Sequence, residues 1–297
     1  MLDFVWAENM SKGIGVLLVV VLALSSVLLF FPVEAQTEGR TIVVPDDYPT
    51  ISVALTNAED GDTIFVKRGT YREHSFVIDK SITLVGEDVG NTRIVNIDQT
   101  PELDRSKHFL PPFPPAVVQI NADNVKLSGF SINTSYSSYV RINVHATRVE
   151  ITDNIIENSY VKVNGNNNTI AQSSLGYAYV ELKGQYNCVL HNQWSTNTSV
   201  LESVSIVGSY NLVYGNTVTD DGTRLSSIKI GGDNNIVAKN TLACDFSIVA
   251  SGSNNWIFAN HLLKSGALVI LSDFNLIFAN QVENGNIVIN AIYTPID

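Results

Sequence analysis

The sequence predicts an all-β protein, a right-handed parallel β-helix of about ten coils with a short N-terminal capping α-helix. Three observations indicate this fold. A short Asn-containing unit repeats along the chain, a strand of alternating apolar residues precedes each copy, and a small residue lies between the two. A single coil cannot bury its apolar face alone. Stacked coils can, because each strand pairs with its copy about 4.8 Å away.

The repeated unit is an Asn, an aliphatic residue two positions later, a second Asn, and an apolar residue two positions after that. A clear copy reads Asn187, Val189, Asn192 and Trp194. Further copies begin at Asn211, Asn235, Asn255 and Asn275, and degenerate copies begin at Val125, Val149 and Asn168. We expect the repeated Asn side chains to stack as ladders in the turns, each amide bonding its copies in adjacent coils.

The strand before each unit carries a pair of apolar residues separated by one outward position. These pairs are Ile142 and Val144, Val161 and Val163, Val180 and Leu182, Val204 and Ile206, Ile228 and Ile230, Ile248 and Ala250, Leu268 and Ile270, and Ile287 and Ile289. The small residues that follow are Ala122, Ala146, Gly165, Gly184, Gly208, Gly232, Gly252, Ser272 and Ala291, at intervals of 19 to 24 residues. Such variable intervals predict loops of different length between fixed strands, whereas a left-handed hexapeptide helix holds a stricter period.

Residues 1–35 carry an export signal. Gly13 to Phe31 is a 19-residue apolar stretch that follows Lys12, and Pro32-Val33-Glu34-Ala35 places small residues before a cut after Ala35. This pattern is typical of a secretory signal peptide. The stretch is also long enough to span a bilayer, so an uncleaved N-terminal anchor is the alternative, and the only membrane association that the sequence predicts. Either prediction gives a secreted or cell-surface protein whose single β-helix domain spans residues 36–297.

The first part of this domain contains a helix and a long loop. Thr50 can cap a helix over residues 51–58 that ends at Gly61-Asp62, and we expect the helix to cover the open end of the coil stack. Strands are predicted over residues 41–45, 63–66, 76–78 and 82–85. Residues 98–115 contain Pro111, Pro112, Pro114 and Pro115, which predicts a loop that protrudes from the coils.

Several segments near the N-terminus resemble a known family. They are Val44-Pro45-Asp46-Asp47-Tyr48-Pro49-Thr50-Ile51, Ala58-Glu59-Asp60-Gly61-Asp62-Thr63-Ile64, Gly69-Thr70-Tyr71 and Lys80-Ser81-Ile82-Thr83-Leu84-Val85-Gly86. These segments resemble the opening of pectin-lyase-like parallel β-helix proteins, and are closest to the NosD-like, carbohydrate-binding and sugar-hydrolysis-type repeat proteins. The resemblance runs from about residue 42 to the C-terminus. It implies the fold more than a function, because the same scaffold carries lyases, hydrolases, esterases, copper accessory proteins and surface proteins without catalysis.

One outer sheet face combines aromatic and charged residues. Its first outward column reads Arg141, Tyr160, Tyr179, Ser203, Ser227, Ser247 and Ala267, and its second reads Asn143, Lys162, Glu181, Ser205, Lys229, Val249, Val269 and Val288. Tyr139 and Tyr177 lie just upstream. Aromatic rings pack on the apolar faces of sugars, and charged groups bond hydroxyls or uronate carboxylates. The predicted carbohydrate-binding residues are Tyr139, Arg141, Tyr160, Lys162, Tyr177, Tyr179 and Glu181. The alternative is an ordinary solvated face with Tyr chosen for its strand propensity.

A second candidate site is acidic. Asp220 and Asp221 lie in one loop, and Asp245 lies at the corresponding place in the next coil. Carboxylates brought together this way would suit Ca²⁺ or an acid/base pair. The alternative is that Asp220-Asp221-Gly222 is simply a turn. No other cofactor is expected: copper, which the family resemblance also implies, needs Met, Cys or His clusters, and both Met residues lie at or before position 10.

The net charge of the chain and the apolar residues of its last coils indicate which kinds of partner to expect. The net charge of −11 argues against nucleic acid, because phosphate binding needs clustered Lys and Arg. Val249, Val269 and Val288 predict an outward apolar stripe for self-association.

Three hypotheses follow. The first is an extracellular β-helix that binds cell-surface or environmental polysaccharide without catalysis. The second is a lyase or glycosidase acting on acidic polysaccharide, with Arg141, Lys162 and Glu181, or the three aspartates, as catalytic residues. The third is a structural, self-associating surface protein.

Overall fold

The structure is a computed structural model that describes most of the chain from residue 39 onward. The described residues are 39–98, 116–134, 140–157, 159–176, 179–196, 204–220, 226–243, 246–263 and 266–290. The predicted signal segment 1–35 and residues 99–115 of the predicted loop lie outside them, so both stay predictions. In the described part of the chain, no helix combines the length and apolarity needed to cross a membrane.

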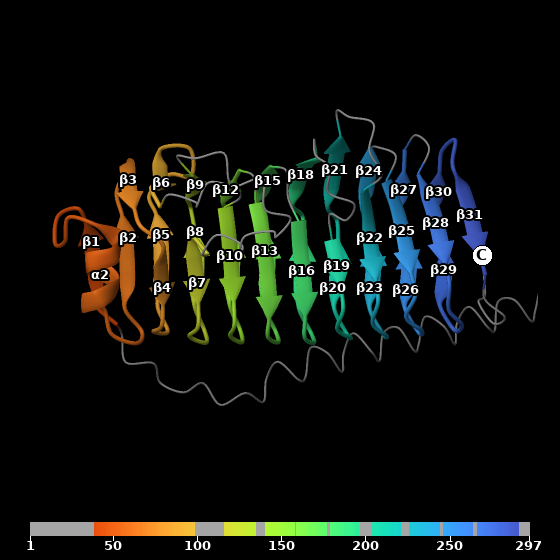
Figure 1. Cartoon of the computed structure of the whole chain (residues 1–297), viewed down its shortest axis with the longest axis horizontal. Helices are drawn as coiled ribbons and strands as arrows, with labels where there is room; N and C mark the ends of the chain where they lie inside the picture. Colours follow the sequence, from red (N-terminus) through yellow and green to blue (C-terminus); the bar gives the residue numbers. More distant parts are fainter. Residues whose placement is uncertain are drawn as a thin grey trace, which may run out of the picture. The chain divides into compact units, whose positions relative to one another are not determined.

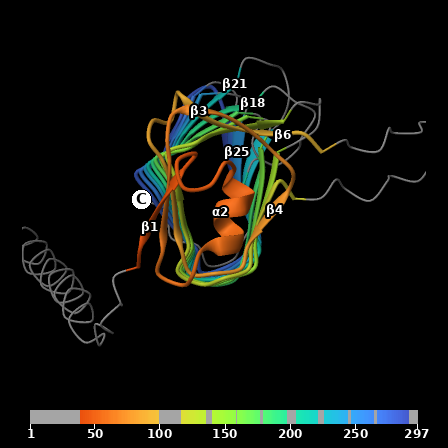
Figure 2. The ribbon, with the colours of Figure 1, turned by 90° about the vertical axis from the view of Figure 1, so that its left-hand side faces the viewer.

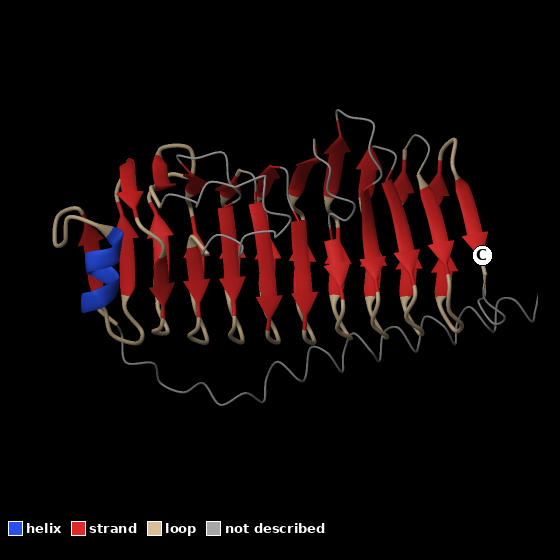
Figure 3. Cartoon of the chain, viewed as in Figure 1, coloured by secondary structure: helices blue, strands red, loops and turns tan. Residues whose placement is uncertain are grey.

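The described residues form three parallel β-sheets and one helix (Figures 1 and 3). Sheet A contains β1 (Thr41–Val44), β2 (Thr63–Val66), β5 (Thr83–Gly86), β8 (Lys126–Ser128), β11 (Glu150–Thr152), β14 (Thr169–Ala171), β17 (Cys188–Leu190), β20 (Leu212–Tyr214), β23 (Ile236–Ala238), β26 (Trp256–Phe258) and β29 (Leu276–Phe278). Sheet B contains β3 (Gly69–Glu73), β6 (Thr92–Asn96), β9 (Ser131–Thr134), β12 (Ile155–Ile156), β15 (Ser174–Gly176), β18 (Gln193–Thr196), β21 (Thr217–Asp220), β24 (Thr241–Ala243), β27 (His261–Leu262) and β30 (Gln281–Val282). Sheet C contains β4 (Phe76–Ile78), β7 (Val118–Ile120), β10 (Val140–Val144), β13 (Ser159–Asn164), β16 (Tyr179–Lys183), β19 (Val204–Ile206), β22 (Ser226–Ile230), β25 (Phe246–Ala250), β28 (Ala267–Ile270) and β31 (Asn286–Ile289).

Each coil runs from sheet C to sheet A to sheet B, and then returns to sheet C one level along the stack. Viewed along the stack, sheets A and C lie on opposite sides of the core and sheet B closes the third side (Figure 2). The predicted parallel β-helix is therefore confirmed. The outer faces of sheets A and C point in opposite directions, which separates any surfaces they carry.

The core consists of the inward residues of the three sheets. All eight predicted apolar pairs point inward, and from Ile142 to Ile270 their members are buried. Each fully buried Val, Leu or Ile side chain stabilises the folded state by about 1.5–3 kcal/mol relative to an exposed one. In the last pair Ile287 is exposed and Ile289 is partly buried, because β31 is the last described strand of sheet C and pairs only with β28.

Two ladders of buried Asn join the coils, as predicted. The turn between sheets A and B holds Asn154, Ser173, Asn192, Asn216, Asn240, Asn260 and Asn280, and the turn between sheets C and A holds Asn168, Asn187, Asn211, Asn235, Asn255 and Asn275. Asn216 Nδ2 donates to Asn240 Oδ1 at 2.9 Å and to the Val189 carbonyl oxygen at 2.9 Å. Most of these Asn side chains thus bind backbone as well as their copies, which satisfies most polar groups of the turns inside the core. Among the described residues, the Nδ2 groups of Asn235 and Asn255 are buried without a hydrogen-bond partner.

The column of small residues has a steric cause. It lies in the turn from sheet C to sheet A, where neighbouring coils approach closely. A Cβ atom on Gly208 would lie 1.7 Å from the carbonyl oxygen of Gly184 in the preceding coil. Only glycine fits there without moving the backbone.

The helix α2 (Ile51–Asn57) covers the first coils (Figure 2). Thr50 caps it as predicted, with its side chain accepting from the Val53 amide. The helix ends at Asn57, one residue before the predicted Ala58, because Ala58 is already extended. The buried carboxylate of Glu73 accepts from the Ile51 amide at 2.8 Å, which ties the helix to sheet B.

We expect Asn216→Ala to lower the free energy of unfolding by about 2–4 kcal/mol, because it leaves buried donors of Asn192 and the Val189 carbonyl oxygen without partners. Thr217→Ala, at the neighbouring exposed position on sheet B, should cost less than about 1 kcal/mol. Denaturant unfolding followed by circular dichroism measures both. Equal losses for the two variants would contradict the role of the ladder.

Candidate functional site

The predicted columns of aromatic and charged residues lie together on the outer face of sheet C. In the pairing of β10 with β13, Arg141 is opposite Tyr160 and Asn143 is opposite Lys162. In the pairing of β13 with β16, Tyr160 is opposite Tyr179. We call Arg141, Tyr160, Lys162, Tyr179, Glu181 and Lys183 the sheet C cluster.

The first column of the cluster is an aromatic stack. The rings of Tyr160 and Tyr179 lie 4.9 Å apart between centroids, with 22° between their planes. The guanidinium carbon of Arg141 lies 5.2 Å from the centroid of the Tyr160 ring. Cation, ring and ring therefore follow one another on three successive coils, and both rings are half-buried. Such stacking fixes ring positions before any ligand arrives.

Glu181 lies at the centre of the second column. Its Oε1 atom is 2.6 Å from Lys183 Nζ, and its Oε2 atom is 3.7 Å from Lys162 Nζ. The hydroxyl of Tyr160 donates to Oε2 at 3.3 Å. Glu181 lies on the outer face of sheet C, but only 8% of the residue is exposed, because these neighbours cover it. The carboxylate therefore holds two ammonium groups and a phenol in fixed positions.

The surroundings set the charges of the cluster. Burial by itself raises the pKa of Glu181, but the Lys183 hydrogen bond and the charges of Lys162 and Lys183 outweigh it, so the pKa lies below the ordinary value. Burial and the neighbouring Glu181 raise the pKa of Tyr160 to about 12. Burial lowers the pKa of Arg141, although an arginine stays charged in proteins. At neutral pH the cluster holds the ionised carboxylate of Glu181, the neutral phenol of Tyr160 and three cations.

Sequence reasoning missed Lys183, although extending the alternation of β16 by one outward step reaches it. Lys183 is exposed and makes the shortest contact with Glu181. Tyr139 and Tyr177, which were predicted to belong to this face, lie outside the described residues.

The acidic candidate stays a prediction. Asp220 ends β21, but its side chain, Asp221 and Asp245 lie outside what the structure describes. Among the described residues, no group of three or more His, Cys, Asp or Glu side chains could hold a metal ion. Val249, Val269 and Val288 align in register on sheet C as predicted, and their role in self-association is likewise a prediction.

Comparisons with known proteins bear on the fold. No protein family model matches the chain, and no curated protein matches its sequence. A mannuronic acid specific polysaccharide family 6 lyase from human gut microbiota matches with a TM-score of 0.50 and 13% identity, over 84% of this chain and 83% of that one. The pectin methylesterase PemA from Erwinia chrysanthemi matches with a TM-score of 0.46 and 10% identity, over 84% of this chain and 91% of that one.

The likeness is one of fold. At such identities it extends to the parallel β-helix and not to any site residue. The resemblance to pectin-lyase-like proteins predicted from the N-terminal segments is therefore confirmed for the fold, while the NosD-like assignment stays a prediction.

We expect acid to destabilise the chain through Glu181. A carboxylate whose pKa is lowered by folding stabilises the folded state above its unfolded pKa of about 4.3, and this stability is lost as the pH falls through the folded pKa. Thermal midpoints of the wild type should fall more steeply below about pH 5 than those of Glu181→Gln. Lys183→Gln should also make the thermal midpoint fall less steeply below about pH 5, because it removes the strongest partner of Glu181. Parallel curves for the wild type and Glu181→Gln would contradict this.

Proposed function

We propose that the chain is an exported protein that binds an acidic extracellular polysaccharide on the outer face of sheet C. The observation that carries the proposal is the sheet C cluster: an aromatic stack beside three cations, on a chain whose net charge is −11. A local excess of positive charge on an acidic protein favours an anionic ligand at this place over other parts of the surface.

Each residue has a part in this proposal. Arg141 and Tyr179 cover the two faces of the Tyr160 ring, so the outward edges of the two stacked rings would contact the apolar faces of sugar rings. Arg141 would bind a uronate carboxylate with its planar guanidinium group, and Lys162 would bind carboxylates or hydroxyls. Glu181 would not compete with the ligand, since its two oxygens are already bound to lysines and to Tyr160.

Binding is favoured over catalysis because the titrating groups of the cluster are occupied. Tyr160, with a pKa of about 12, is a poor base at neutral pH. Glu181 is ionised, so it is a poor general acid, and it is the one carboxylate of the sheet C cluster, whereas glycosidases use two.

A polysaccharide lyase is the second candidate. The contact of the Tyr160 hydroxyl with Glu181, beside Lys162, favours it, because phenol, carboxylate and ammonium could pass a proton along this face. The lyase that shares this fold is described as mannuronic acid specific, which makes polymannuronate the first probe.

The test is isothermal titration calorimetry with polymannuronate, polygalacturonate and an uncharged glucan. We expect binding to the acidic polymers that weakens with salt. Tyr179→Ala should weaken it about tenfold, which corresponds to about 1.4 kcal/mol. The matched control is Tyr186→Asn, a tyrosine in a turn outside the cluster, and it should bind like the wild type.

The same mixtures distinguish the two candidates. Unsaturated oligosaccharide products that disappear in Lys162→Ala would make the chain a lyase. Absence of binding to all three polymers would exclude both candidates at this face and leave the structural hypothesis.

A further inference from the structure

The outer face of sheet A changes character along the stack. In its first outward column the early coils carry Lys126 and Glu150, whose charged groups lie 4.0 Å apart, followed by Thr169. From β17 onward the same column reads Cys188, Leu212, Ile236, Trp256 and Leu276. Trp256 is 50% exposed. The polar surface of the early coils thus gives way to an apolar one.

The second outward column of sheet A is polar at Ser128 and Thr152 and apolar again from Ala171. From β17 onward it reads Leu190, Tyr214, Ala238, Phe258 and Phe278. The Phe258 and Phe278 rings stack at 4.8 Å with 4° between their planes. We call these two columns, over β17 to β29, the apolar face. Neither column contains an ionisable carboxylate or ammonium group, a composition typical of interface centres.

One rim of the apolar face is aromatic as well. Tyr186, Tyr210 and Phe274 lie in the turns from sheet C to sheet A with φ of 59°, 60° and 62°, where most other coils have Asn and one has Arg148. Bulky residues in this left-handed conformation are strained. The Tyr186 and Tyr210 rings stack at 5.2 Å, and about half of each residue is exposed. These exposed rings extend the apolar surface over the rim.

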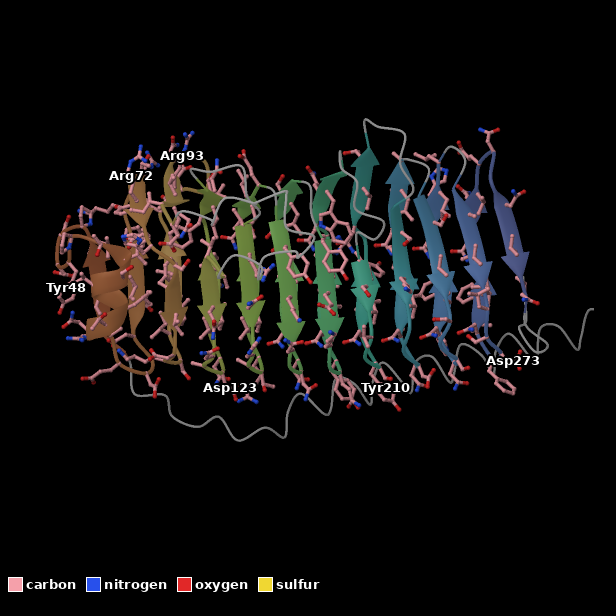
Figure 4. The ribbon with its side chains drawn as sticks, in the orientation of Figure 1. Tyr48, Arg72, Arg93, Asp123, Tyr210 and Asp273 are labelled. Carbon is pink, nitrogen blue, oxygen red and sulfur yellow. The ribbon has the colours of Figure 1, made fainter. Side chains whose placement is uncertain are left out.

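The two rims carry opposite charge. Asp233 and Asp273 lie in the turns that lead into sheet A, and Figure 4 shows Asp273 on the same edge of the stack as Tyr210. Lys239 lies on the other rim, in the turn that leaves sheet A, with Nζ 5.4 Å from the centroid of the Tyr214 ring. Asp233 and Lys239 flank the same strand, β23.

We propose that a second copy of this chain covers the apolar face, related to the first by a two-fold axis parallel to the coil stack. This rotation places each coil of one copy opposite the same coil of the other copy, with the two strands running in opposite directions. Asp233 of each copy therefore meets Lys239 of the other. The aromatic column of one copy, with Tyr214 and Phe258, then faces the column with Leu212 and Trp256 of the other. A two-fold axis along the strands would bring the two acidic rims together, and such repulsion disfavours it.

The size of the face sets the strength of the contact. At about 4.8 Å between strands and 3.3 Å per residue, five strands with their rims span roughly 24 Å by 23 Å, on the order of 550 Å². A stable interface buries about 800 Å² on each partner. The dimer is therefore concentration-dependent. It leaves both sheet C clusters uncovered, because sheet C faces away from sheet A.

Sedimentation velocity tests the proposal without any glycan, so its outcome is independent of the proposed function. Residues Gly39–Asp297 form a compact unit of their own, so the chain starting at Gln36 is used. We expect the weight-average mass to rise toward twice the monomer mass between about 1 and 200 μM. Trp256→Glu should remain a monomer over this range. The matched control Val77→Glu, an exposed outward valine on β4, should dimerise like the wild type.

Charge reversal tests the orientation. Lys239→Asp should weaken the dimer at least about tenfold, and Lys239→Asp combined with Asp233→Lys should restore it, with thermal midpoints checked for each variant. A wild type that stays monomeric overturns the proposal, as does loss of the dimer in Val288→Glu with retention in Trp256→Glu. Monomers that bind neutral phosphatidylcholine vesicles through Trp256 would assign the face to a membrane instead.

Discussion

The stacking of buried Asn side chains between coils is the constraint on which the rest of this structure depends. A turn inside a solenoid leaves backbone N–H and C=O groups in the core, where an unpaired group costs about 1–3 kcal/mol. Asn216 shows the solution: its Oδ1 accepts from the Asn192 amide, and its Nδ2 donates to the Val189 carbonyl oxygen. Because Asn192, Asn240, Asn260 and Asn280 repeat this arrangement in other coils, the turns hold the three sheets in register. The register in turn decides which outward residues become neighbours.

The sheet C cluster illustrates this consequence. Tyr160 and Tyr179 are 19 residues apart in sequence, and they stack only because β13 and β16 are adjacent and aligned. Burying Glu181 costs solvation, which two ammonium groups and a phenol offset. The result is a rigid surface in which one anion orders three cationic or polar neighbours. Such preorganisation favours binding, since less freedom is lost when the ligand arrives.

The solenoid also separates its surfaces by sheet. Sheet C carries charge and aromatic rings in its middle coils, whereas the outer face of sheet A is apolar from β17 onward. Within one coil the outward residues of Cys188–Leu190 and of Tyr179–Lys183 lie on opposite sides of the core. A single chain can thus present a polar face to one partner and an apolar face to another.

Much of this could be predicted from the sequence. The repeat and the alternating pairs determined the coil, the inward residues and the outward columns, because period and register follow directly from residue spacing. The burial of Glu181 could not be predicted, since it depends on the contacts of its side chain with Tyr160 and Lys162 in the preceding coil. Lys183 lies on the same strand as Glu181 and could have been found from the alternation. The apolar face of sheet A was not predicted from the sequence either. Its strands are three residues long, so an outward residue such as Trp256 looks in sequence like a further core residue, and only the tertiary structure decides which side of the sheet it faces.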